Sequence, residues 1–96
     1  MKYTNAVRFE WDPVKAATNV RKHGVSFQEA AECFEDPLAL VLDEPRAPER
    51  LILIGTSRSH RLIYTVYAER TAAMIRIISA RKATVRERRE YEEGDH

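Results

Sequence analysis

The spacing of apolar residues changes along the chain and predicts a mixture of helices and strands. Residues 27–34 repeat apolar side chains at i, i+3, i+4 and i+7, the period of an amphipathic helix. From residue 38 the period becomes two, which is typical of a strand. Similar patterns predict strands over residues 7–11, 38–42, 50–56, 62–69 and 74–81. Because short links join the later strands, we expect antiparallel pairing and an α+β fold with the order β-α-α-β-β-β-β-α.

Capping residues place the two N-terminal helices. Asp12 before Pro13 predicts a helix start, and Gly24 after a basic last turn predicts its end at His23. Ser26 and Glu29 have the spacing of a capping box for a second helix, which Asp36-Pro37 ends. We expect both helices to pack on one face of the sheet.

The segment 74–91 combines apolar residues with positive charge. Its first half is apolar on both alternating faces, so we predict a strand covered on both sides, although it contains Arg76 and ends at Arg81. An arginine buried without a partner is costly, so each needs a carboxylate or an anionic ligand. Thr84 and Glu87 then form a capping box for a third, largely exposed helix, with Val85 and Tyr91 turned inward.

Length and composition predict one domain over residues 1–96, in the reducing cytoplasm. No apolar run approaches the roughly 20 residues that cross a bilayer, no signal sequence is apparent, and the single Cys33 permits no internal disulfide. Residues 49–96 contain 10 Lys and Arg against 7 Asp and Glu, whereas residues 1–48 contain 6 against 8. This asymmetry indicates an electropositive surface for which a phosphate-containing partner is one explanation.

Arg76 and Arg81 are candidate cations for a phosphate-containing partner. The two arginines are five residues apart, so they point to opposite faces unless a bulge intervenes or Arg81 lies beyond the strand end. The alternative for Arg76 is a structural salt bridge to a helix carboxylate such as Glu29 or Glu32.

Other candidates each have a structural alternative. His23 is suited to proton transfer because the pKa of histidine lies near neutrality, but a histidine also stabilises a helix C-terminus. Tyr91 has the chemistry to stack on a base or to transfer a proton, yet an aromatic residue on an amphipathic helix also packs on a core. His60 lies in a basic turn and has no role assigned by the pattern.

A metal-dependent nuclease is a weaker hypothesis. Glu10 and Asp12 near Lys15 have the chemistry to hold Mg²⁺ and activate water. Asp12 already has a capping role, and no further acidic cluster completes a ligand set. Cys33 has no nearby Cys or His at zinc-binding spacing, so we expect no metal and no cofactor.

Several separated motifs resemble the BrnT toxins of bacterial type II toxin–antitoxin pairs. They are Phe9-Glu-Trp-Asp12 with Lys15 and Asn19, Lys22-His-Gly-Val-Ser-Phe27, Asp36-Pro37, Ile54-Gly55, and Arg76-Ile-Ile-Ser-Ala-Arg81 with Glu87-Arg88 and Tyr91. The resemblance implies a RelE-like fold, a ribonuclease that blocks translation, and a BrnA-like antitoxin of the ribbon-helix-helix type. We expect a heterotetramer with two copies of each chain, which contacts operator DNA only through the antitoxin.

The RNA cleavage that the resemblance implies can proceed by attack of a ribose 2′-OH on the adjacent phosphate, which needs a base, an acid and positive charge around the phosphate. The candidate site combines residues suited to these roles. Those with a proposed catalytic role are Arg81, Arg76, His23, Lys22, Glu87 and Tyr91. Those expected to bind RNA, either free or as ribosome-bound mRNA, are Lys15, Arg58, Arg61 and Arg88. A non-catalytic nucleic-acid or protein-binding module is the alternative, because a basic sheet surface alone gives salt-dependent phosphate binding.

Overall fold

The computed structural model describes Tyr3 and residues 6–94. The elements are β1 (Arg8–Glu10), α1 (Pro13–His23), α2 (Phe27–Glu32), the 3-10 turn η1 (Cys33–Glu35), β2 (Leu40–Asp43), β3 (Leu51–Thr56), β4 (Leu62–Thr71), β5 (Met74–Lys82) and α3 (Val85–Glu92). Five strands form one mixed sheet in the order β1-β5-β4-β3-β2, in which β1 pairs parallel to β5 and the other neighbours pair antiparallel. The predicted α+β fold and element order are confirmed.

The N-terminal helices begin where the capping signals predict. The Asp12 carboxylate accepts hydrogen bonds from the backbone N–H groups of Val14 and Lys15, and Gly24 ends α1 in the left-handed conformation with φ 68°. The Ser26 hydroxyl caps α2. The second helix is shorter than predicted, because the chain tightens into η1 and then turns at Asp36 before β2 begins.

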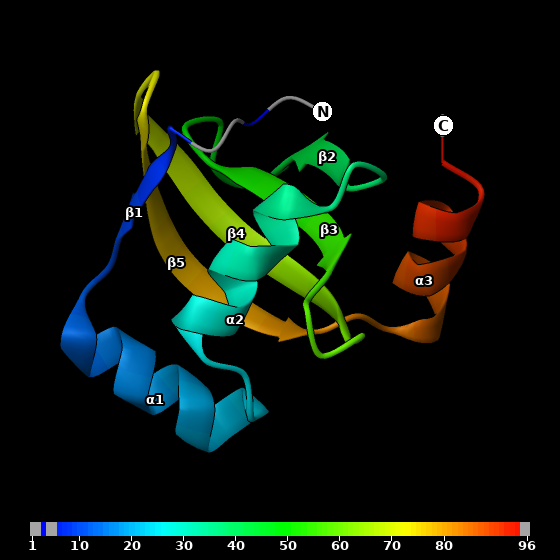
Figure 1. The fold of residues 1–96 in the computed structure, drawn as a ribbon, viewed down its shortest axis with the longest axis horizontal. Coiled ribbons are helices and arrows are strands. Elements are labelled where there is room, and N and C mark those ends of the chain that lie inside the picture. Colours follow the sequence, from blue (N-terminus) through cyan, green and yellow to red (C-terminus); the bar gives the residue numbers. More distant parts are fainter. Residues whose placement is uncertain (1–2, 4–5, 95–96) are drawn as a thin grey trace.

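Figure 1 shows α2 in front of β4 and β5, whereas α1, which contacts β5, lies beside the sheet. The core between α2 and the sheet contains Phe27, Phe34, Tyr67, Ile75 and Ile77, which are almost fully buried. Aromatic rings meet edge to face in this core, as Phe34 and Tyr67 do with their centroids 4.9 Å apart. This burial fixes which face of β5 points inward, and therefore which face stays available.

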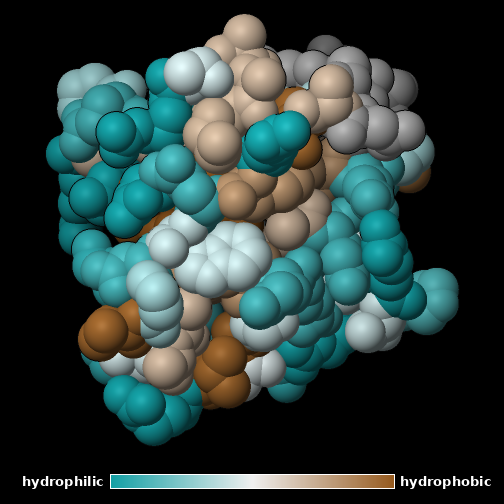
Figure 2. All heavy atoms as spheres, turned by 60° about the vertical axis from the view of Figure 1, so that its left-hand side comes forward, coloured by the Kyte–Doolittle hydropathy of each residue, from teal (hydrophilic) through white to brown (hydrophobic). Residues whose placement is uncertain are grey.

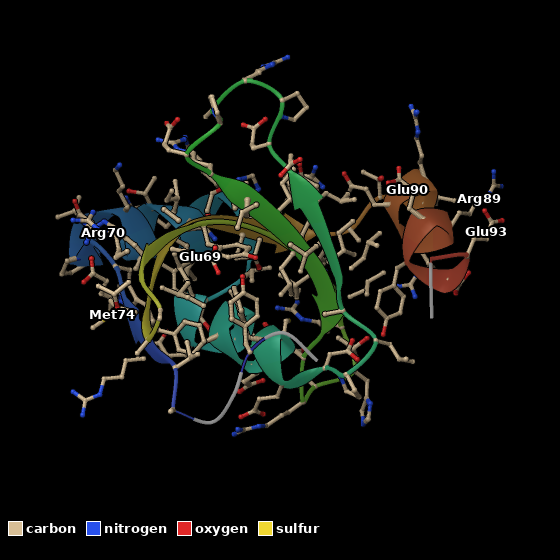
Figure 3. All side chains as sticks on the ribbon, turned by 90° about the horizontal axis from the view of Figure 1, so that it is seen from above. Glu69, Arg70, Met74, Arg89, Glu90 and Glu93 are labelled. Atoms are coloured by element: carbon tan, nitrogen blue, oxygen red, sulfur yellow. The ribbon has the colours of Figure 1, made fainter. Side chains whose placement is uncertain are left out.

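We call the face of the sheet away from α2 the open face. A second apolar cluster lies there, with Ile52, Ile54 and Leu62 buried and other side chains half-buried around them. α3 covers only part of this face, and its contacts are mainly with β3. Figure 3, seen from above, shows the curved strands with Glu69, Arg70 and Met74 around the β4–β5 turn. Arg89 and Glu90 of α3, and Glu93 just after it, lie at the opposite side.

Two predictions about burial in the C-terminal half are wrong. β5 is not covered on both sides, because α3 packs toward β3 and leaves the open face of β5 half-exposed. Val85 does not turn inward: it is 71% exposed. Glu87 and Tyr91, four residues apart, share the side of α3 that contacts the body, whereas Val85 is two residues from Glu87 and points away. Within the described residues, no helix is long and apolar enough to span a membrane.

Candidate active site

A bulge in β5 brings the two candidate arginines to the same face. Val66 pairs with Ser79 and Tyr67 pairs with Ile77, so Ile78 is an extra residue without a partner on β4. Arg76 and Arg81 therefore lie opposite Ala68 and Tyr64, respectively, which share one face of β4. The five-residue spacing does not separate the arginines, because the bulge changes the alternation between them.

Arg81 is held on the open face by several contacts. Its Nη1 and Nη2 atoms donate to the two carboxylate oxygens of Glu87, each at 2.8 Å, and Nη1 also donates to the Lys82 carbonyl at 3.2 Å. The guanidinium carbon lies 4.0 Å from the centroid of the Tyr64 ring. Hydrogen bonding to Arg81 holds the pKa of Glu87 below its usual range. Glu87 is therefore a weak base, and its contacts favour a role in positioning Arg81.

These contacts leave one edge of the Arg81 guanidinium available. A guanidinium has five N–H donors, and the bonds to Glu87 and Lys82 use three of them. The remaining donors, on Nε and Nη2, have no hydrogen-bond partner in the part of the chain that the structure describes. They lie along one side of the planar group, where their fork matches two oxygens of a phosphate.

Arg76 forms a salt bridge, but not with the predicted partners. Its Nη1 donates to Glu10 at 2.7 Å, instead of to Glu29 or Glu32. The partner differs because β1 pairs in parallel with β5 and places Glu10 directly beside Arg76. The two side chains are 38% and 36% exposed, so the other N–H groups of Arg76 remain accessible from solvent.

In Arg58 and Arg61, the edge of the guanidinium formed by Nε and Nη2 already donates to a carboxylate. Arg61 donates from Nε and Nη2 to Glu29, and from Nη2 to the Gly24 carbonyl. Arg58 donates from Nε and Nη2 to Glu35. These pairs tie the turn between β3 and β4 to α2 and η1. Their geometry favours a structural role over the predicted RNA contact.

Three predicted residues of α1 line one hollow beside the bulge. Lys15, Lys22 and His23 face Ile78 and Ser79 of β5 across a space of ≈ 290 Å³, and Val14, Thr18 and Asn19 complete the lining. No carboxylate lines this hollow, and its two lysines and histidine form no ion pair with any other described residue. This is an environment that favours an anion.

Ser79 connects the hollow with the two arginines, and sequence reasoning did not select it. Its side chain lies on the open face with Arg76 and Arg81, and it also lines the hollow. Its position inside the segment 76–81 is the only signal in the sequence. That signal does not give the face of the strand, because the face depends on the bulge at Ile78.

Asn19 holds α1 against β5 at this point. Its amide donates to the carbonyls of Val25 at 2.9 Å and Ala80 at 2.7 Å, and its oxygen accepts from the Ala80 N–H at 3.1 Å. β1 pairs with β5 only as far as Arg76. Beyond that point, the buried Asn19 side chain forms hydrogen bonds with the backbone N–H and carbonyl of β5 that no strand pairs with. The position of the hollow therefore depends on Asn19.

A different hollow has the opposite character. It lies between β1 and α2, has a volume of ≈ 340 Å³, and is lined by Phe9, Trp11, Gln28, Ala31, Glu32, Glu35 and Arg58. Figure 2 turns the side with β1 toward the viewer and shows hydrophobic residues between hydrophilic ones. Two carboxylates at this hollow disfavour a phosphate, whereas the hollow at Ser79 has none.

The remaining predicted residues lie elsewhere. Arg88 borders a basic hollow at the end of β5 with His60, Arg61 and Lys82. The Tyr91 hydroxyl donates to Asp36 at 2.6 Å, and burial together with this hydrogen bond raises the pKa of Tyr91. The Tyr91 ring packs in the second apolar cluster, an arrangement that favours holding α3 in place.

The geometry gives the metal hypothesis little support. Glu10 is paired with Arg76, and Asp12 caps α1. Among the described residues no group of three or more His, Cys, Asp or Glu side chains is arranged to hold a metal ion. Cys33 is buried, and burial raises the pKa of its thiol to about 12.

Comparisons with known proteins agree with this picture. Residues 11–87 match the model of the family described as "Ribonuclease toxin, BrnT, of type II toxin-antitoxin system". The chain is also similar to the crystal structure of the Brucella abortus ribonuclease toxin BrnT, with 32% identity and a TM-score of 0.66 over 81% of this chain and 97% of that one. A search of curated proteins found no match. The family match includes α1, the bulge, both arginines and Glu87, and the chain belongs to the BrnT family of ribonuclease toxins of type II toxin–antitoxin systems.

Proposed function

We propose that this protein is a bacterial toxin that cleaves RNA internally and thereby inhibits translation. The observation that carries the proposal is the fixed Arg81, which presents an unused N–H edge on the open face. Ser79 joins this face to the carboxylate-free hollow containing Lys22 and His23. A phosphodiester at this junction lies between fixed positive charge and a group able to transfer a proton.

The proposed reaction uses the RNA itself as nucleophile. The ribose 2′-OH attacks the adjacent phosphorus while His23 accepts its proton, and the free edge of Arg81 binds the nonbridging oxygens as negative charge develops. The bond from phosphorus to the 5′-oxygen breaks, and that oxygen takes a proton from solvent water. Other phosphates of the RNA are bound by Arg76, Lys15 and Lys22. The products carry a 2′,3′-cyclic phosphate and a 5′-hydroxyl.

Cleavage is expected to need no metal ion, because the guanidinium groups supply the positive charge and the substrate supplies the nucleophile. Purified protein should cleave a defined RNA equally well with excess EDTA and with added Mg²⁺. A substrate with 2′-deoxyribose at the cleavage position should bind and remain intact. Loss of cleavage in EDTA that Mg²⁺ restores, or products with 5′-phosphates, would overturn this mechanism in favour of a site around Glu10, Asp12 and Lys15. RNA binding without any cleavage would favour the non-catalytic module.

We further propose that a BrnA-like antitoxin silences the toxin by covering its basic open face with an acidic segment. The support is charge complementarity, since Arg76 and Arg81 place positive charge on this face, beside β4 side chains such as the half-buried Tyr64. Dimerisation through the DNA-binding part of the antitoxin brings two toxins together and confines operator contact to the antitoxin.

The expected assembly is a heterotetramer with two copies of each chain. Size-exclusion chromatography with light scattering on the co-purified chains should give the mass of two toxins and two antitoxins. A complex that remains 1:1 over a wide concentration range would contradict this assembly. The complex should also fail to cleave RNA that the free toxin cleaves.

A further inference from the structure

We propose that Tyr64 is a positioning residue of this ribonuclease site, where its ring fixes the plane of the Arg81 guanidinium. The inference rests on the proposed function and adds a residue that none of the sequence motifs contains. Tyr64 lies in β4, directly opposite Arg81 across the β4–β5 pair, and its ring centroid is 4.0 Å from the guanidinium carbon. The guanidinium therefore lies over the ring on the open face.

The ring is itself held by the sheet. Tyr64 packs in the second apolar cluster beside its cross-strand partner Ile54, which is fully buried. Burial raises the pKa of the Tyr64 hydroxyl, and the hydroxyl has no hydrogen-bond partner in the described parts of the chain. The ring, and not the hydroxyl, is therefore the part of this side chain that touches the site.

Glu87 and Tyr64 restrict different motions of Arg81. The two hydrogen bonds to Glu87 lie along one edge of the guanidinium and resist sliding within its plane. They resist tilting about that edge much less. The guanidinium carbon lies over the face of the Tyr64 ring, so the ring occupies the space on one side of the group and opposes this tilt. With both contacts present, the unused N–H edge keeps one direction, which a bidentate phosphate contact requires.

The test compares RNA cleavage by purified variants that keep or remove the ring. Tyr64→Phe keeps the ring and should retain kcat within about twofold, because the hydroxyl has no part in the contact with Arg81. Tyr64→Leu and Tyr64→Met keep an apolar side chain but lose the ring, and both should lower kcat by roughly tenfold or more, since small displacements of a positioned group are costly. KM should change much less, because the ring does not contact RNA.

Three controls separate positioning from a general effect on folding. Val66→Ala removes apolar volume from the same face and cluster, two residues along β4, and should leave kcat unchanged. Thermal unfolding of each variant, followed by circular dichroism, establishes that the compared proteins are folded at the assay temperature. In an Arg81→Lys background, loss of the ring should cost less than about twofold, because an ammonium group has no plane to orient.

Each outcome decides the inference. Equal losses from Tyr64→Leu in the wild-type and Arg81→Lys backgrounds, or a loss from Val66→Ala as large as that from Tyr64→Leu, would overturn the positioning role. A loss in Tyr64→Phe that matches Tyr64→Leu would also overturn it. If folded wild-type protein cleaves no RNA, the proposed function fails, and the inference fails with it; if wild type cleaves and the Tyr64 variants match it, only the inference fails.

Discussion

Arg81→Ala is expected to remove the toxicity of this chain in a bacterial host and to lower RNA cleavage by the purified protein about a hundred- to a thousandfold. The substitution deletes the N–H edge proposed to bind the phosphate in the transition state. It also leaves Glu87 without its bidentate partner, which places an uncompensated negative charge near the substrate. Growth after induction, intact mRNA on a gel, and the cleavage rate of a defined RNA would measure the effect.

Two further variants show whether the loss of cleavage is specific to the Arg81 guanidinium. Arg81→Lys keeps the charge but loses the planar fork, so it should recover binding better than cleavage. Arg86→Ala removes a cation of the same type from α3, where the side chain is 92% exposed and pairs only loosely with Glu90, and should cleave RNA as wild type does. Persistent cleavage by folded Arg81→Ala would contradict the proposed site. Growth arrest with intact RNA would instead indicate a non-catalytic binding module.

Of the substitutions considered, Asn19→Ala is expected to cause the largest loss of stability, and to lower the free energy of unfolding by about 2–4 kcal/mol. The buried amide makes three hydrogen bonds, and its removal leaves the Ala80 N–H and the carbonyls of Val25 and Ala80 without these partners. α1 is then less firmly attached to β5, and the hollow with Lys22 and His23 loses its fixed wall. Urea denaturation followed by circular dichroism would measure the loss.

Thr18→Ala is the matched control, because Thr18 precedes Asn19 in the same helix and, among the described residues, Arg21 is the one hydrogen-bond partner of its hydroxyl. Its effect should stay within about 0.5 kcal/mol. Asn19→Asp should be at least as harmful as Asn19→Ala, because it places a carboxylate beside two carbonyl oxygens. An Asn19→Ala protein as stable as Thr18→Ala would show that water replaces the amide at little cost.

Much of the fold follows from local signals in the sequence. Asp12, Ser26 and Thr84 cap the three helices, and Gly24 ends the first. The strand periods and short links predict the antiparallel part of the sheet, and the uneven charge predicts a basic surface. These signals are readable because caps, turns and side-chain periods depend on residues within a few positions of one another.

The sequence by itself determined the elements, their order, the family motifs and most of the residues at the candidate site. Only the tertiary structure decided which of those residues act together. The bulge at Ile78 places Arg76, Ser79 and Arg81 on one face, and parallel pairing of β1 with β5 gives Arg76 the partner Glu10. Which arginine keeps an unused edge depends on carboxylates brought close by pairing between distant segments. No local sequence pattern indicates those pairings, because strand register and side-chain contacts depend on how the whole sheet is buried.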